Sequence, residues 1–201
     1  MSIPTKYNGG LTREQFLFYE IRIVASLLCE GLSRDEVIER IKDENLFQFP
    51  TERMLTTITR ACFRRIDALE SQTLTEYLAH APMEVAKQIN LYAIMKQNRI
   101  VWEFMITVIG EKFRTQDFEF TNKDLNVFIL NLQEMNDDVA SWSESTLAKI
   151  KQVLRKCLVE CEYLDSVKST TLNPIAIVPE LEEEIREKND YLALQAFNCF
   201  S

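Results

Sequence analysis

The sequence predicts a mainly α-helical protein made of two tandem units that resemble helix-turn-helix or winged-helix domains, with one short β-wing near residues 167–179. Only 4 of the 201 residues are glycine and 5 are proline, which favours long helices over many short strands and turns. Apolar side chains recur at helical spacing in most segments. A long helix, a short capped helix and a basic helix follow one another twice along the chain, which indicates the two units.

The first unit is expected to span residues 1–75 and to open with two helices. A helix that begins near Thr12 should end at Gly31, because glycine readily adopts the left-handed conformation that closes a helix. Ser33 and Glu36 then form a capping box, in which each side chain binds the backbone N–H of the other residue. This pattern predicts the start of a second, shorter helix.

The third helix of the first unit should run from Thr51 to Leu69, because Pro50 disfavours a helical residue before it. Its apolar residues fall on one side at helical spacing, and its polar side is basic. A short helix from Leu74 to His80 should follow it. The candidate DNA-binding residues on the basic helix are Arg53, Arg60, Arg64 and Arg65.

The second unit is expected to span residues 76–201. A helical region from Met83 to Phe113 should bend near Gln97-Asn98, where polar residues interrupt an apolar run. Thr121-x-x-Asp124 forms a second capping box and opens the next helix. The unit should close with an edge strand bounded by two prolines, and then with a helix whose acidic first turn suits its dipole. These two elements are Asn173–Pro179 and Glu180–Phe197.

A basic amphipathic helix from Ser143 to Leu164 is the most informative stretch. Ser143 is a candidate N-cap, because its hydroxyl can accept a hydrogen bond from a first-turn N–H. No Asp or Glu occurs from Thr146 to Val159. The net charge of −8 counts by itself against a nucleic-acid-binding protein, so the position of the charges matters more than their sum. The candidate DNA-binding residues here are Lys149, Lys151, Gln152, Arg155 and Lys156.

The two units correspond in their caps. Ser33-x-x-Glu36 aligns with Thr121-x-x-Asp124, and Thr51 aligns with Ser143 at the start of the basic helices. In a helix-turn-helix, one helix presents polar and basic residues to the major groove while its apolar side holds the core. Double-stranded DNA is therefore the expected partner, bound through its phosphates with little sequence preference. An ordinary solvated helix surface is the alternative interpretation of each basic face.

Composition and motifs argue against several other classes. The N-terminus is polar and no segment reaches the ~18 apolar residues of a membrane span, so we expect a cytoplasmic protein with no membrane partner. Five cysteines, an odd number, suit reduced thiols. Cys157 and Cys161 lack the second pair that a structural zinc requires, and no phosphate loop or nucleophile elbow is present. We therefore expect no catalytic residue, no metal and no cofactor, and hence no enzyme.

Four stretches share the pattern of one known family: Arg22–Ser33, Asn45–Gln48, Ala93–Arg99 and Trp142–Thr146. They resemble the BrxA family, small proteins of the bacterial BREX phage-exclusion systems. The resemblance implies a mostly helical, cytosolic, non-enzymatic protein with winged-helix-like parts, which binds DNA in antiviral defence beside other BREX proteins. Two alternatives stay open. One is a scaffold that docks other BREX subunits through the Ile89–Ile109 helix, and the other is a helical RNA-binding module.

Overall fold

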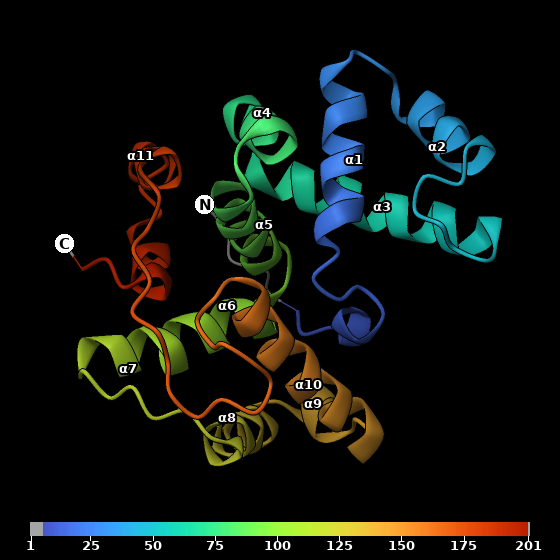
Figure 1. The fold of residues 1–201 in the computed structure, drawn as a ribbon. Coiled ribbons are helices and arrows are strands. Elements are labelled where there is room, and N and C mark those ends of the chain that lie inside the picture. Colours follow the sequence, from blue (N-terminus) through green and yellow to red (C-terminus); the bar gives the residue numbers. More distant parts are fainter. Residues whose placement is uncertain (1–5, 201) are drawn as a thin grey trace. The chain divides into compact units, whose positions relative to one another are not determined.

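The computed structural model describes residues 6–200, and its regular secondary structure is helical (Figure 1). Its contacts divide the chain into two compact units. The central unit comprises residues 17–97, and the terminal unit combines residues up to 16 with those from 98 onward. The prediction of a mainly α fold is confirmed.

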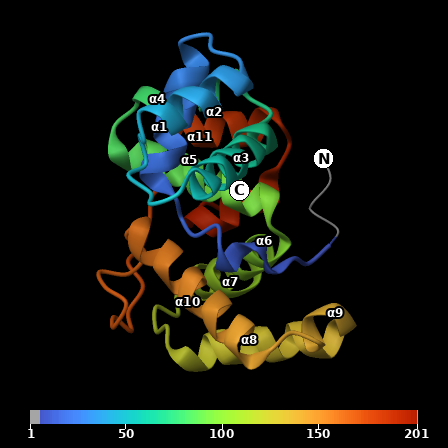
Figure 2. The same cartoon turned by 90° about the vertical axis from the view of Figure 1, so that its right-hand side faces the viewer.

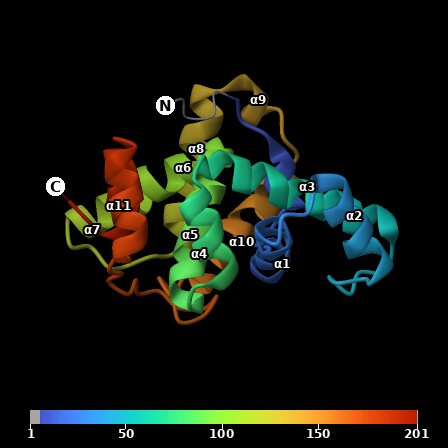
Figure 3. The same cartoon turned by 90° about the horizontal axis from the view of Figure 1, so that it is seen from above.

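The central unit consists of five helices. Helix α1 crosses α3 (Figure 1). Helix α4 packs against both α1 and α5, and it lies beside them in Figure 3. The unit continues past residue 75, because α4 and α5 complete the hydrophobic core that α1 and α3 begin. The helices are α1 (Phe18–Cys29), α2 (Arg34–Asp43), α3 (Glu52–Leu69), α4 (Gln72–His80) and α5 (Met83–Gln97).

The first long helix starts later than the sequence predicts. Gly9–Thr12 forms a separate 3-10 turn, η1, and the Thr12 hydroxyl donates to the carbonyl of Gly9 at 2.8 Å instead of capping a helix. Leu17 then adopts a left-handed conformation with φ 53°, so the helix can begin only at Phe18. The predicted end is confirmed, since Gly31 has φ +89° after the last turn of α1.

Helix α5 is buried on nearly every side. The side chains from Ile89 to Met95 are all inside the core of the central unit. The chain then breaks at Asn98, whose side-chain oxygen accepts hydrogen bonds from the N–H groups of Ile100 and Val101. The predicted bend near Gln97-Asn98 is confirmed. The scaffold alternative expects an exposed docking surface along Ile89–Ile109. This expectation is wrong for the residues that belong to α5, because the core of the central unit already covers them.

The terminal unit is built from both ends of the chain. Helix α10 lies across α8 in Figure 2, and η1 packs on α10. The segments α6, η2 and α7 follow one another as one helical run, of which η2 is a π-helical stretch. The elements are α6 (Arg99–Phe104), η2 (Met105–Gly110), α7 (Glu111–Arg114), α8 (Asn122–Met135), α9 (Asp137–Ala140), α10 (Glu144–Glu160), α11 (Pro179–Glu187) and η3 (Tyr191–Phe197).

The last predicted helix, Glu180–Phe197, is divided in two. Asn189 has φ 55°, which ends α11, and the chain re-enters a 3-10 segment, η3. This segment packs on η2 at Gly110. A Cβ atom at Gly110 would lie 3.1 Å from Cβ of Gln195, so glycine permits this close approach. The short segment η3 thereby becomes part of the core.

The predicted β-wing near 167–179 and the edge strand Asn173–Pro179 are wrong for the part of the chain that the structure describes. One isolated antiparallel bridge joins Glu119 to Thr171, flanked by two backbone hydrogen bonds of 2.8 Å. Beyond it, Pro174 has no N–H to donate, and the N–H of Asn173 bonds the carbonyl of Tyr163 instead of a neighbouring strand. The segment is therefore a structured loop.

Candidate nucleic-acid interface

Helix α3 presents a polar stripe on its solvent side. Thr51 caps the helix by accepting a hydrogen bond from the N–H of Met54 at 3.3 Å. Its exposed residues Arg53, Arg60 and Arg64 recur at helical spacing, with Thr57 between them. Within residues 6–200, no carboxylate lies within ion-pair distance of Arg53 or Arg60. Three of the four predicted cations of this helix are thus accessible.

Arg65 is the exception on α3. It is fully buried, with 0% of its surface exposed, so it cannot contact a duplex while the central unit is folded. Its spacing from Ile58, Cys62 and Leu69 places it on the apolar side of the helix. Arg65 is therefore not part of the accessible face of α3.

Helix α10 begins as the sequence predicts. The Ser143 hydroxyl accepts a hydrogen bond from the N–H of Thr146 at 3.2 Å, which confirms it as the N-cap. One side of the helix is buried in the core of the terminal unit, through Ile150, Val153, Leu154, Cys157 and Leu158. The opposite side faces solvent and carries the predicted lysines.

The lysines of α10 have neutral partners. Lys149 donates to the amide oxygen of Gln152 at 2.9 Å, Lys151 to that of Asn126 at 2.8 Å, and Lys156 to that of Gln15 at 3.2 Å. An amide orients an ammonium group without cancelling its charge. By contrast, many cations elsewhere in the described chain pair with carboxylates, namely Arg34, Arg40, Lys42, Arg99, Lys112, Arg114, Arg186 and Lys188. The positive charge of α10 therefore remains uncompensated by ion pairs.

Arg155 holds the loop that follows α10. Its guanidinium donates to the carbonyl oxygens of Val167 (3.3 Å) and Ser169 (3.0 Å) and to the side chain of Asn122 (3.3 Å). The same group lies 4.9 Å from the ring centroid of Phe120, within the range of a cation–π contact. Burial lowers the pKa of Arg155 from its ordinary value, although arginine stays charged at neutral pH. Arg155 thus has a structural role that the sequence did not suggest.

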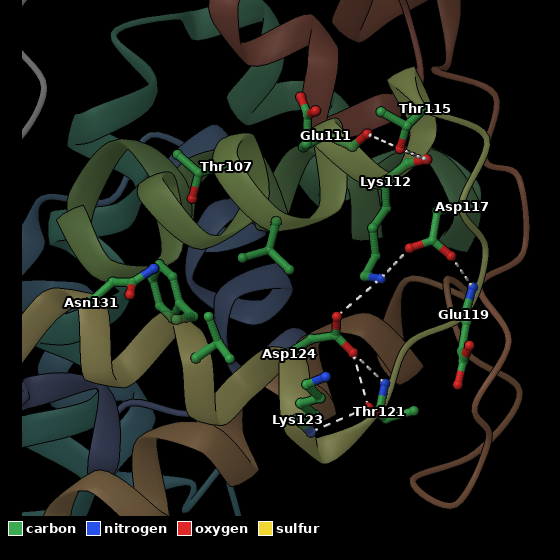
Figure 4. Close-up of a pocket in the computed structure, with 13 residues that line it drawn as sticks. Thr107, Glu111, Lys112, Thr115, Asp117, Glu119, Thr121, Lys123, Asp124 and Asn131 are labelled. Atoms are coloured by element: carbon green, nitrogen blue, oxygen red, sulfur yellow. Dashed lines mark hydrogen bonds and ion pairs between the residues drawn. The ribbon is translucent and has the colours of Figure 1, made fainter.

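A second charged cluster lies beside α8, in a cavity of about 560 Å³ (Figure 4). Lys112 donates to Asp117 at 2.8 Å and to Asp124 at 3.0 Å, and Asp124 also accepts the N–H of Thr121 at 2.7 Å in the predicted capping box. Burial acts to raise the pKa of Asp124, but the hydrogen bonds from Thr121 and Lys112 outweigh it and lower that pKa. These groups satisfy one another, so the cluster stabilises the turn before α8.

In the part of the chain from 6 to 200, no three His, Cys, Asp or Glu side chains gather as metal ligands. None of the helices in that range has the length and hydrophobicity needed to cross a lipid bilayer.

The chain was then compared with known proteins. The family model BrxA matches residues 5–189. The chain belongs to the BrxA family. It is 36% identical over 162 residues to the BREX protein BrxA of Bacillus cereus (strain H3081.97), and the alignment covers 81% of this chain and 80% of the relative. It is 22% identical over 174 residues to the BREX protein BrxA of Escherichia coli O9:H4 (strain HS), and that alignment covers 87% of this chain and 81% of the relative. The BrxA resemblance found in the sequence is confirmed, and with it membership of a family of BREX phage defence.

The fold is also similar to a solved structure. An uncharacterized protein from Magnetospirillum magneticum superimposes with a TM-score of 0.81 at 22% identity, over 95% of this chain and 97% of that one. At this identity the likeness concerns the fold alone. The two proteins share the same fold.

Proposed function

We propose that this BrxA family member binds double-stranded DNA, without catalytic activity of its own, as its part in BREX phage defence. The observation that carries the proposal is the solvent side of α10. Lys149, Lys151 and Lys156 lie there without a carboxylate partner, in a chain whose net charge is −8. A cationic patch in an acidic protein attracts a polyanion locally while the rest of the surface does not.

The order of helices supports binding in the manner of a helix-turn-helix. In the central unit α2 leads through a turn into α3, and in the terminal unit α8 and α9 lead into α10. We propose that α3 and α10 are the helices that enter or border the major groove, and that the loop 162–172 takes the place of a wing. Contacts to phosphates by arginine and lysine would supply the affinity and carry little sequence information.

The test is a salt series of binding to duplex DNA, single-stranded DNA and RNA of the same sequence. The parent should prefer the duplex, and its affinity should fall steeply with salt. The double variant Lys149→Glu, Lys156→Glu should bind far more weakly, and its slope of log K against log salt should fall by about 1.8, since each phosphate contact contributes about 0.9.

The matched control reverses two cations outside the proposed face. Lys6 and Arg114 are exposed in the same unit, and the variant Lys6→Glu, Arg114→Glu changes the net charge equally. It should keep at least a third of the parent affinity. Equal losses in the two double variants would show that only the net charge matters and would refute the proposed face. A parent that prefers RNA would favour the RNA-binding alternative.

Protein docking is the second candidate function, favoured by an apolar surface on α8. Val127, Leu130 and Met135 expose 46%, 56% and 83% of their surfaces on this one helix, and gathered apolar surface is typical of protein interaction sites. Capture of another BREX subunit in nuclease-treated extract, lost in Leu130→Lys and Met135→Lys, would support it. Capture that depends on added DNA would argue for the DNA-binding function alone.

A further inference from the structure

A notch lies between α8 and α10 in the terminal unit, with a volume of about 400 Å³. Its polar lining consists of Asn122, Asn126, Lys151, Gln152 and Arg155. No aspartate or glutamate lines it. We propose that this notch is an oxyanion site that receives a phosphodiester group of the DNA backbone. The inference rests on the proposed function and names one point at which the duplex is held.

In the notch, the side-chain oxygens of three amides accept hydrogen bonds from cations, whereas the N–H groups of the same amides have no described partner. Lys151 bonds the amide oxygen of Asn126 at 2.8 Å, and Arg155 bonds that of Asn122 at 3.3 Å. The amide oxygen of Gln152 accepts from Lys149 at 2.9 Å. Each of these three amides therefore has its oxygen engaged by a cation, while its two N–H donors bond no other described residue. The notch therefore offers a ligand amide N–H donors that have no described partner, and such donors suit an oxyanion.

The charges around the notch have the same sign. Lys151 and Arg155 contribute two positive charges, and Lys149 adds a third through its bond to Gln152. The carboxylate of Asp124 is near enough to act on Arg155, whose pKa it raises against the effect of burial, and Lys112 binds this carboxylate at 3.0 Å. Its negative charge is thereby compensated locally. An anion in the notch gains attraction from three cations and is not opposed by an unpaired acid.

The notch also borders the proposed DNA face. Ala148 and Gln152 are exposed at its edge, and helical spacing places them on the same side of α10 as Lys149 and Lys156. A phosphate that entered the notch would lie next to phosphates bound along that face. A backbone phosphodiester fits this position, because successive phosphates of one DNA strand follow one another along the protein surface.

The decisive comparison uses two substitutions on one helix. Asn126 and Asn131 are both exposed on α8, but Asn126 lines the notch and Asn131 lines the other cavity. Asn126→Asp places a carboxylate in the oxyanion site and, by pairing with Lys151, keeps the fold. Asn131→Asp makes the same change of net charge elsewhere. We expect duplex binding at 0.1 M salt to weaken about tenfold in Asn126→Asp and less than twofold in Asn131→Asp.

A second measurement reports on the site directly. The side-chain amide resonances of Asn122, Asn126 and Gln152 are followed by NMR during titration with a short duplex and, separately, with inorganic phosphate. Saturable shifts with the duplex at micromolar concentration are expected, and with inorganic phosphate only at millimolar concentration. Tight binding of inorganic phosphate would instead assign the site to a free small anion and overturn the backbone assignment.

The outcomes distinguish failure of the notch proposal from failure of the proposed DNA-binding function. Equal effects of Asn126→Asp and Asn131→Asp, with duplex binding still lost in the Lys149→Glu, Lys156→Glu variant, refute the notch and leave the proposed function standing. A parent that binds no duplex at any salt refutes the function. In that case the phosphate titration still decides whether the notch binds an oxyanion, and unshifted amides would refute the site as well.

Discussion

Replacing Arg155 by methionine should loosen the loop 162–172 and destabilise the terminal unit. Methionine keeps an unbranched apolar stem that can still cover Phe120, but it donates no hydrogen bond. Three bonds are lost, to the carbonyls of Val167 and Ser169 and to the side chain of Asn122. Bonds that involve a charged group contribute about 1.5–3 kcal/mol when buried.

The free energy expected from these contacts is smaller than that range implies. The loop is largely exposed, so water can replace part of each bond to a carbonyl. We assign about 1 kcal/mol to each bond, and the ring contact adds about 0.5 kcal/mol. Arg155→Met should therefore lower the free energy of unfolding by about 3.5 kcal/mol. Arg155→Lys, which keeps the charge but not the fork of donors, should recover less than half of that loss.

Urea unfolding and amide hydrogen exchange together provide the assay. The variant should unfold at lower urea, and the amides of residues 166–172 should exchange faster than in the parent. Arg114→Met serves as the control, because Arg114 is exposed and its ion pair with Glu111 is open to solvent, so its loss should leave the unfolding midpoint nearly unchanged. Equal stability of Arg155→Met and Arg114→Met, with unchanged exchange in the loop, would refute the anchoring role.

Two further predictions concern stability in the same unit. Asp124→Asn removes one of the two carboxylate partners of Lys112 and weakens the capping box with Thr121, so it should cost about 1 kcal/mol at pH 7. The folded state lowers the pKa of Asp124, so its contribution to stability is present above the ordinary aspartate pKa of about 3.9 and is lost as pH falls below that value. The free energies of unfolding of parent and variant, measured by urea titration, should therefore converge at acidic pH. Gly110→Ala should cost about 1–3 kcal/mol, since the new methyl group would meet Gln195 at 3.1 Å. Thermal unfolding measures this loss, and an unchanged melting temperature would contradict the close packing of η3.

Local signals predicted the starts of helices well. Ser33, Thr121 and Ser143 all cap the helices that the sequence assigns to them, because a capping hydrogen bond involves only residues two or three positions apart. The start near Thr12 failed for the opposite reason. Leu17 bends the chain there, and no local pattern requires a leucine to adopt a positive φ.

The candidate interface was predicted less completely than the fold. Arg65 was assigned to the accessible side because of its charge, although its spacing from Ile58 and Cys62 already places it on the apolar side. The role of Arg155 depends on a loop more than ten residues away, and Asn126 meets Lys151 only after α8 and α10 have packed. Contacts of this kind follow from tertiary structure and leave no local pattern in the sequence.

The use of both chain ends in one unit has a consequence for how the protein is made. The central unit, residues 17–97, is continuous and can fold as soon as the ribosome has released it. The segment before it can reach its final contacts only after later residues have been synthesised, because Tyr7 donates to Glu103 and Gln15 accepts from Lys156. The core of the terminal unit also needs η3, where the carbonyl of Ala196 accepts the hydroxyl of the buried Tyr163 at 2.8 Å. The core that supports the helix proposed to hold DNA is therefore complete only after residue 196 has been synthesised.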